Sequence, residues 1–340
     1  AGARPDVVAP EIVEQTLSNG IEVVAAQTGE VPIATMTVLV PGGASTDTRE
    51  KAGVAQFAAS LAEQGTADMS AQEIAARLES LGASFGANAG RDGTYFSLTA
   101  PVANFEVADI VRSAQYPQAE LDRERKRAID GLLVEMKDPG ALAGKVATLV
   151  MYGDAPYGSQ PGGTAESLAA ITREDLLDHR QTWWQPSETK IIVSGGIAPA
   201  QATALANTLF GDWQVDASAP TPVSDPAGEA QPVRTVVIDM PEAGQAAVYA
   251  AVRAIPRDDE RYYALELANA VLGGGSSGRL FEEIRTKRSL SYGAYSGFGD
   301  RADDSVLAAS AQTKNETADE VAQIFLDEFA RLGTDPLDDA

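Results

Sequence analysis

The sequence contains no cysteine and a single histidine, His179. The absence of cysteine excludes disulfides, thiolate metal sites and cysteine nucleophiles. A single imidazole excludes chemistry that requires two of them. His179 lies between Asp178 and Arg180 on an expected helix. We expect it to be a surface or half-buried residue without a catalytic role, because no second histidine or cysteine can assist it.

Positive charge is scarce as well, with 26 Lys and Arg against 49 Asp and Glu and a formal net charge of -23 at pH 7. This balance argues against a nucleic-acid partner, because phosphates would be repelled, and it would attract basic or neutral peptides. No apolar run approaches the roughly 18 residues that span a bilayer, so we expect no membrane span.

The first five residues, Ala1-Gly2-Ala3-Arg4-Pro5, do not form a basic and then apolar signal segment. They are compatible with a mature end left after signal removal or with an arbitrary start. The compartment therefore stays open between a bacterial periplasm, which we favour, and the cytoplasm.

The length of 340 residues suits two domains of ordinary size. Alternating runs on both sides of Ser18-Asn19-Gly20 predict a hairpin, and alternation around Arg91-Asp92-Gly93 predicts another. A proline-rich stretch over 214–232 has the composition of a linker. We therefore predict an N-terminal domain over 1–213 and a C-terminal domain over 233–340.

The second half repeats the order of the first, with strands expected at 234–240 and 246–254, a polar turn, and a helix over 262–271. The repeat predicts an α+β protein of two homologous domains, each an antiparallel sheet flanked by helices. The second copy is only about half as long as the first. Either it is incomplete or the interpretation as a duplication is wrong.

Three stretches occur in the order found in one family of peptidases. They are Gly53-Val54-Ala55-Gln56-Phe57-Ala58-Ala59-Ser60, Pro156-Tyr157-Gly158 with Gly163-Thr164-Ala165-Glu166-Ser167, and Leu272-Gly273-Gly274-Gly275-Ser276-Ser277-Gly278-Arg279-Leu280-Phe281. Together they resemble the pitrilysin family of zinc peptidases, which includes insulin-degrading enzyme and the mitochondrial processing peptidase. The resemblance covers nearly the whole chain.

The first stretch lies where active members of that family carry H-x-x-E-H on a helix. Two imidazoles four residues apart bind one zinc ion there, and the Glu acts as general base on bound water. Here the three positions read Gln56, Ala59 and Ser60, and a third ligand would fall near Asp130 or Gly131. The resemblance thus implies that this chain binds no zinc itself. Alternatively, Gln56 and Ser60 are simply polar residues of an amphipathic helix.

In the same family an Arg and a Tyr seven residues apart bind the substrate backbone and support the developing oxyanion. Arg285 and Tyr292 have that spacing, and a guanidinium and a phenol are suitable donors to carbonyl oxygens. A structural alternative stays open, in which Arg285 pairs with Glu282 or Glu283 and Tyr292 packs in a strand.

The loop with Gly273, Gly274 and Gly275 is not a phosphate-binding loop, because no Gly-Lys-Ser/Thr follows it. The resemblance implies that it lies near the path of the substrate. The alternative is a flexible connection between helices, capped by glycine.

The resemblance therefore implies a non-catalytic, substrate-binding subunit of a zinc peptidase, inactive alone. Its partner would be a homologous subunit with an intact H-x-x-E-H motif, which supplies zinc and the general base, in a heterodimer or larger assembly that cleaves peptides. Two alternatives from other classes are a structural scaffold protein and a peptide-binding protein without a peptidase partner.

Overall fold

The computed structural model describes residues 9–214, 220 and 223–335. The chain forms two compact units, the first from 1–128 with 161–223 and the second from 129–160 with 224–340. The strands are β1 (Ile12–Thr16), β2 (Glu22–Gln27), β3 (Ile33–Pro41), β4 (Ser84–Ala89), β5 (Gly93–Pro101), β6 (Lys190–Gly195), β7 (Ala246–Ala254), β8 (Ala294–Asp300) and β9 (Ser305–Thr313). The α-helices are α1 (Val54–Ser60), α2 (Ala71–Leu81), α3 (Ile110–Ser113), α4 (Gln118–Glu135), α5 (Pro139–Tyr152), α6 (Ala165–Ala170), α7 (Arg173–Trp183), α8 (Pro199–Phe210), α9 (Tyr262–Leu272) and α10 (Ala318–Thr334).

The first unit is built on a six-stranded sheet in the order β1-β2-β6-β3-β5-β4. All of its strand pairs are antiparallel except β2 with β6, which is parallel. Both predicted hairpins are confirmed, and Gly20 supplies the positive φ of +93° that the first turn requires.

One face of this sheet carries the core of the first unit. Along β3, Ala34, Met36, Val38 and Val40 are buried and alternate with more exposed residues. Helix α1 contacts β4 and β5, and α8 contacts β1 and β2. Helix α2 begins with a capping box, in which Ser70 Oγ accepts from the backbone N–H of Glu73 and the Glu73 carboxylate accepts from the backbone N–H of Ser70. The alternation of apolar and polar residues along the strands thus determines the face of the sheet on which the helices pack.

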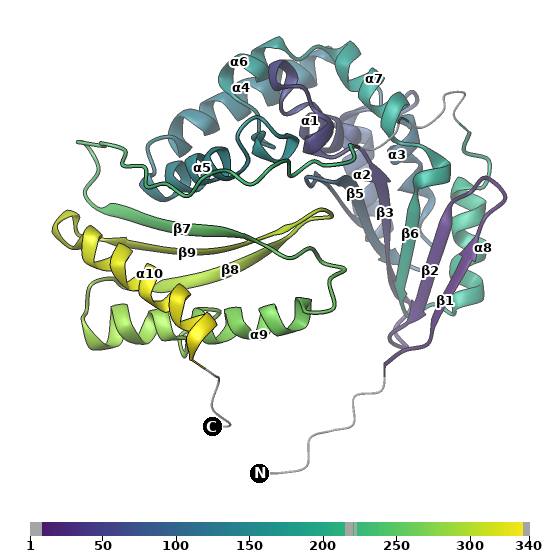
Figure 1. Ribbon diagram of the computed structural model, residues 1–340. Helices are drawn as coiled ribbons and strands as arrows, with labels where there is room; N and C mark the ends of the chain where they lie inside the picture. Colours follow the sequence, from purple (N-terminus) through teal and green to yellow (C-terminus); the bar gives the residue numbers. More distant parts are fainter. Residues whose placement is uncertain (1–8, 215–219, 221–222, 336–340) are drawn as a thin grey trace. The chain divides into compact units, whose positions relative to one another are not determined.

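The second unit has three layers around an antiparallel sheet in the order β7-β9-β8 (Figure 1). On one face, residues of β9 pack with α9 and α10 in a core that includes Leu272, Leu280, Ile284 and Phe325. On the other face, α5 packs on β7 and β9. The prediction of an α+β fold with helices flanking sheets is confirmed.

A polar cluster joins the C-terminal end of α5 to the sheet of the second unit. The Tyr152 hydroxyl donates to Asp304 Oδ2 at 2.8 Å, and Arg253 Nε donates to the same oxygen at 2.8 Å. The guanidinium of Arg301 lies 4.5 Å from the centroid of the Tyr152 ring and 5.1 Å from that of Tyr157. The buried Asp304 carboxylate therefore has cationic neighbours, as a charge removed from water requires.

The structure differs from the predicted domain organisation over 129–160. We expected this segment in the N-terminal domain, but it groups with the second unit because α5 buries Tyr152 against the second sheet. The change of unit at 223–224 lies within the predicted linker, of which residues 215–219 and 221–222 lie outside the described part.

The strand predicted over 234–240 is wrong. These residues form no regular element, and Val237 is 89% exposed. A similar alternation occurs in β2, which is stabilised because it pairs with the later strand β6. Within the described part of the second unit, no strand follows α10 that could pair with 234–240 in the same way. In the described ranges, no helix combines the length and apolarity that crossing a bilayer demands.

Candidate functional site

Helix α1 carries the positions that correspond to the zinc motif, and it begins at a half-buried carboxylate. Asp47 accepts hydrogen bonds from the backbone N–H of Gly53 at 2.9 Å and of Ala55 at 3.1 Å. Burial raises the pKa of Asp47 to about 7, against the lowering effect of these backbone donors. Gly53 has a φ of +102°, and a Cβ atom there would lie 2.7 Å from Leu168. The start of α1 is therefore tightly specified.

The residues at the motif positions do not fit a zinc ion. The Gln56 side-chain oxygen accepts from the backbone N–H of Ala89 on β4 at 3.2 Å. Ala59 is fully buried in a cluster with Ala55 and Ala89, and Ser60 Oγ is buried without a hydrogen-bond partner in the described structure. Zinc sites in proteins use imidazole, thiolate or carboxylate, and none of these groups is present on this face of α1.

The described residues provide no other cluster of metal ligands. Within those residues, no three or more His, Cys, Asp or Glu side chains are grouped to hold a metal. Asp130 and Gly131, where a third ligand was expected, lie on the part of α4 that groups with the second unit, whereas α1 belongs to the first.

His179 is buried, with 7% of its surface exposed, so its prediction as a surface or half-buried residue was wrong. Its Nε2 atom lies 3.2 Å from the carbonyl oxygen of Gly42, and burial lowers its pKa to about 4. Gly42 is itself packed closely, since a Cβ atom there would lie 2.4 Å from Trp183 Cβ. The histidine has a packing role between α7 and the end of β3.

The most distinctive feature of the second unit is an open cavity of about 570 Å³. Its wall comes from one face of the sheet, because Tyr249 on β7 and Tyr295 on β8 are both register partners of Ser310 on β9. The segment 289–293 and the start of α5 complete the wall. The lining residues are Gly140, Gln245, Ala247, Val248, Tyr249, Arg285, Ser289, Leu290, Ser291, Tyr292, Gly293, Tyr295, Ser310, Ala311, Gln312 and Lys314.

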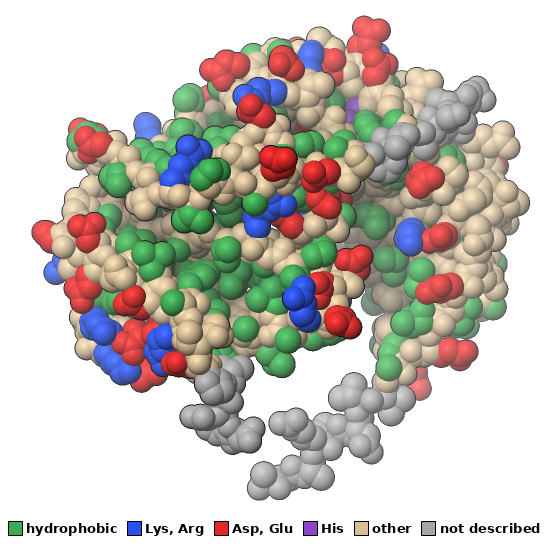
Figure 2. Space-filling model, in the orientation of Figure 1, with side chains coloured by type: hydrophobic (Ala, Val, Ile, Leu, Met, Phe, Trp, Pro, Cys, Tyr) green, Lys and Arg blue, Asp and Glu red, His purple; other side chains and the backbone are tan. Residues whose placement is uncertain are grey.

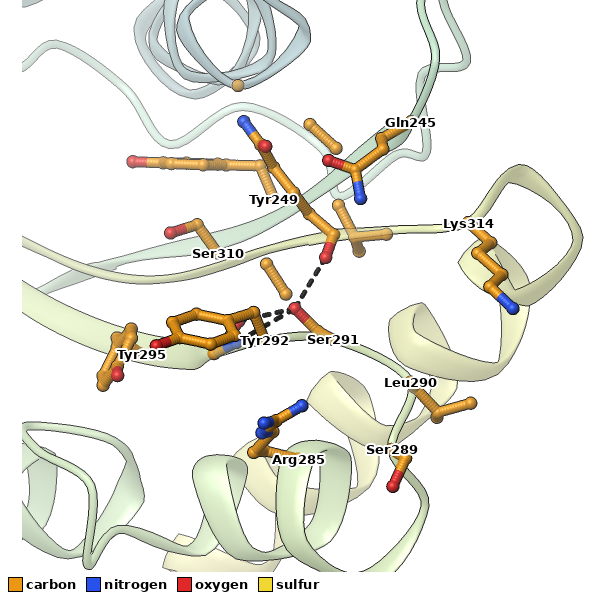
Figure 3. Close-up of a pocket in the computed structure, with 16 residues that line it drawn as sticks. Gln245, Tyr249, Arg285, Ser289, Leu290, Ser291, Tyr292, Tyr295, Ser310 and Lys314 are labelled. Carbon is orange, nitrogen blue, oxygen red and sulfur yellow. Dashed lines mark hydrogen bonds between the residues drawn. The ribbon is translucent and has the colours of Figure 1, made fainter.

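Arg285 and Tyr292 meet at this cavity (Figure 3). Arg285 belongs to a π-helical segment, Phe281–Lys287, and the chain then turns through Ser289, which has a φ of +54°. These deviations bring the guanidinium carbon of Arg285 to 5.1 Å from the centroid of the Tyr292 ring. Tyr292 is 86% exposed and precedes β8. Irregular backbone of both kinds is common at functional sites.

The turn that carries Tyr292 is fixed to β9 by side-chain hydrogen bonds. Ser291 Oγ lies 2.6 Å from the carbonyl oxygen of Gln312, and Thr313 Oγ1 donates to the carbonyl of Leu290 at 2.6 Å. The backbone N–H of Leu290 donates to the carbonyl of Ile284 at 2.9 Å. The positions of Arg285 and Tyr292 are therefore set by neighbours that are themselves anchored.

The structural alternative for Arg285 does not hold in the described structure. Glu283 is paired with Lys287 at 2.6 Å and with Arg288, and Glu282 lies 3.3 Å from Lys287. Within the described residues, no carboxylate lies within 4.0 Å of the Arg285 guanidinium. Tyr292 is not packed in a strand either.

The glycine-rich loop does not line the cavity. A Cβ atom at Gly273 would lie 2.7 Å from the backbone nitrogen of Ser296, and one at Gly274 would lie 2.9 Å from Ala270 Cα. No atom lies within 4 Å of such a position at Gly275. Gly273 and Gly274 are thus required by close packing next to β8 and α9, and only Gly275 is open to other contacts.

Sequence analysis missed Tyr249, Tyr295, Gln312 and Lys314, which share the cavity with Arg285. The alternation of β7 and β9 was a usable signal, because residues 247, 249, 310 and 312 lie on one face. No local pattern, however, indicates that β9 lies between β7 and β8.

Comparisons with known proteins agree with this architecture. Residues 170–340 match the model of the peptidase M16 inactive domain, and residues 22–134 match the insulinase model of peptidase family M16. The chain is 26% identical over 330 residues to an uncharacterized zinc protease of Mycobacterium leprae, covering 96% of this chain and 74% of the relative. It is 23% identical over 325 residues to one of Bacillus subtilis, covering 94% and 78%.

Solved structures show the same fold. A crystal structure of a peptidase M16 inactive domain from Pseudomonas fluorescens is similar with a TM-score of 0.83 and 25% identity, covering 96% of this chain and 80% of that one. A protease from Helicobacter pylori gives a TM-score of 0.90 at 20% identity, covering 97% and 82%. Pitrilysin gives a TM-score of 0.70 at 18% identity, covering 98% of this chain and 37% of that one. The chain therefore belongs to peptidase family M16.

Proposed function

We propose that this chain is the non-catalytic, substrate-binding subunit of a heteromeric zinc peptidase. One observation carries the proposal: the Arg285 and Tyr292 side chains meet at an open cavity, whereas the face of α1 that would bind zinc presents Gln56, Ala59 and Ser60. The chain keeps groups suited to hold a peptide and lacks those that would cleave it.

Arg285 and Tyr292 would hold the backbone of a peptide. A guanidinium has five N–H donors and a phenol has one, and both can bind a carbonyl oxygen. Donors fixed in advance stabilise an oxygen whose negative charge grows in the transition state. The anchoring of the 289–293 turn to β9 supports this role, because it holds the backbone that carries Tyr292 in place.

Zinc and the general base would come from a homologous subunit with an intact H-x-x-E-H motif. The naming of the M. leprae and B. subtilis relatives as zinc proteases supports the class of reaction. The match of 170–340 to the inactive domain supports a non-catalytic role for this chain.

The proposal is tested by co-expressing the chain with its most similar homologue that carries H-x-x-E-H. Each subunit and the mixture are assayed on an unstructured peptide. We expect cleavage that depends on both subunits, and a loss of about 100-fold in kcat/KM for Arg285→Ala or Tyr292→Phe in the assembled pair.

Two variants of the same chain serve as matched controls. Arg288→Ala removes an exposed guanidinium three residues away that is paired with Glu283 and does not line the cavity. Tyr263→Phe removes the hydroxyl of another exposed tyrosine, on α9. Both should keep full activity. Full activity in the Arg285 and Tyr292 variants, with no effect of this chain on the homologue, would instead indicate a scaffold protein.

A further inference from the structure

We propose that the apolar end of α4, formed by Leu133, Val134 and Met136, is a docking surface for the homologous subunit that carries the intact H-x-x-E-H motif. This inference rests on the proposed function, and it adds the place where the two subunits meet. The three residues belong to the second unit, which also contains the cavity with Arg285 and Tyr292.

Helix α4 buries little of its surface. Within its 18 residues, all of which the structure describes, only Leu121 is buried. A helix in a folded protein is usually stabilised by packing of an apolar face. The end of α4 is apolar but not covered, since Leu133 is 58% exposed, Val134 is 71% exposed, and Met136 directly after the helix is 47% exposed. Single exposed apolar side chains are common, whereas neighbouring ones mark a contact surface.

The charge of this region departs from that of the whole chain. About one residue in seven of the sequence is Asp or Glu, and acidic side chains are spread over the face of the molecule in Figure 2. From 131 to 152, by contrast, the acidic Glu135 and Asp138 are balanced by Lys137 and Lys145. Glu135 pairs with Lys145 at 3.2 Å, and Asp138 caps α5. Another acidic protein can therefore cover this surface without like-charge repulsion, and few charges would be buried.

The apolar end of α4 is held close to the cavity. The backbone N–H of Met136 donates to the carbonyl of Leu132 at 2.9 Å, and that of Asp138 donates to the carbonyl of Glu135 at 3.0 Å, so the connection to α5 is ordered. Gly140 at the start of α5 lines the cavity. Because four residues span at most about 14 Å, Met136 lies within that distance of the cavity wall.

This position indicates which partner covers the surface. The subunit that supplies zinc must approach the peptide carbonyl held by Arg285 and Tyr292, so it must lie over the opening of the cavity. A stable interface buries about 800 Å² on each partner, which corresponds to a patch roughly 30 Å across. An interface that covers the opening and the start of α5 therefore extends to the apolar end of α4.

Two other occupants suit the surface less well. The peptide itself is one, but Leu133, Val134 and Met136 do not line the cavity, and peptide side chains are bound in concave pockets rather than on the convex surface of a helix. A second copy of this chain is the other. It would bring no zinc to the opening, because the motif positions on its α1 hold no zinc ligand.

Titration of this chain against the H-x-x-E-H homologue, followed by sedimentation velocity, tests the inference. The variant is Leu133→Gln with Val134→Gln, which makes two exposed side chains polar without changing net charge. The control is Leu326→Gln with Val31→Gln, at positions that are 61% and 66% exposed and lie on other elements. We expect Kd to rise at least about tenfold for the variant and to change less than about twofold for the control.

Peptide cleavage separates this inference from the proposed function. The variant keeps Arg285 and Tyr292, so a saturating concentration of it should restore the wild-type rate of the pair. Arg285→Ala should stay slow at any concentration. The circular dichroism spectrum and melting temperature of each variant check that it is folded.

An unchanged Kd for the variant would overturn the inference and leave the proposed function standing, since the subunits would still assemble. An equal rise in Kd for the control would overturn it too. A homodimer that the variant breaks, with binding of the homologue unchanged, would assign the surface to a second copy, and a rate that stays low at saturation would assign it to the peptide. Absence of both complex and cleavage with the wild-type chain would contradict both proposals.

Discussion

Substitution of His179 by Phe should change how the stability of the first unit depends on pH. Burial lowers the pKa of His179 from 6.5 to about 4. The unfolded chain therefore binds a proton near pH 6.5, whereas the folded chain binds it only near pH 4. Because the folded pKa is the lower one, the stability from neutral His179 is fully present above pH 6.5 and is lost as the pH falls below it.

The magnitude follows from the two pKa values. Each unit of pKa difference corresponds to about 1.36 kcal/mol. Between pH 7.5 and pH 5 the unfolded state takes up the proton almost completely and the folded state hardly at all. The wild type should therefore lose about 2 kcal/mol relative to His179→Phe over this range. Asp47 also titrates here, with its pKa raised to about 7, but it is present in both proteins and cancels in the difference.

Urea unfolding followed by tryptophan fluorescence measures this difference. The three tryptophans, Trp183, Trp184 and Trp213, all lie in the part of the first unit that spans 161–223, so the signal reports on the unit that contains His179. The free energy of unfolding of both proteins is determined at pH 7.5 and pH 5. A difference between the two proteins that stays constant within about 0.5 kcal/mol across the two pH values would refute the assignment of a buried, neutral histidine.

Three further substitutions test other parts of the structure. Asp47→Asn should gain about 2 kcal/mol of stability relative to the wild type as the pH rises from 5 to 7.5. Partial burial raises the pKa of Asp47 to about 7, so the folded wild type must hold a poorly solvated carboxylate at the higher pH. A difference that stays constant in fluorescence-monitored unfolding would contradict this. Ala59→Glu restores the acidic residue of the family motif. It should lower the free energy of unfolding by about 3 kcal/mol, measured as a lower urea midpoint, because Ala59 is buried among alanines. An unchanged midpoint would show that the site has room for the larger side chain. Tyr152→Phe should lower the free energy of unfolding of the second unit by about 1 kcal/mol, since Asp304 loses one donor but keeps Arg253. The loss should appear in unfolding followed by circular dichroism but not by tryptophan fluorescence, because the tryptophans lie in the first unit.

Features with a local cause were predictable from the sequence. The hairpin at Asn19-Gly20 and the capping box of Ser70 and Glu73 depend on neighbouring residues alone, and both are present. The grouping of 129–160 with the second unit was not predictable, because it depends on contacts of α5 with β7, which lies about a hundred residues later. The alternation over 234–240 indicates a strand only if a neighbouring strand pairs with it.

In the candidate site, too, local features were predictable from the sequence and contacts between distant residues were not. The spacing of Arg285 and Tyr292 pointed to both residues, but an ordinary helix would not bring them together. Their contact depends on the π-helical segment and on the positive φ of Ser289, which no motif announces. Lys314 and Tyr249 join the site only through the pairing of β7 with β9. The burial of His179 depends in turn on the end of β3, far from it in the sequence.

The proposed division of roles between two subunits is tested most directly by the rate of peptide cleavage by this chain, by its homologue with an intact H-x-x-E-H motif, and by the two together. We expect the pair to cleave the peptide, neither subunit to do so alone, and Arg285→Ala to lower kcat/KM of the pair by about 100-fold. A homologue that is fully active alone, at a rate unchanged by the addition of this chain, would contradict it.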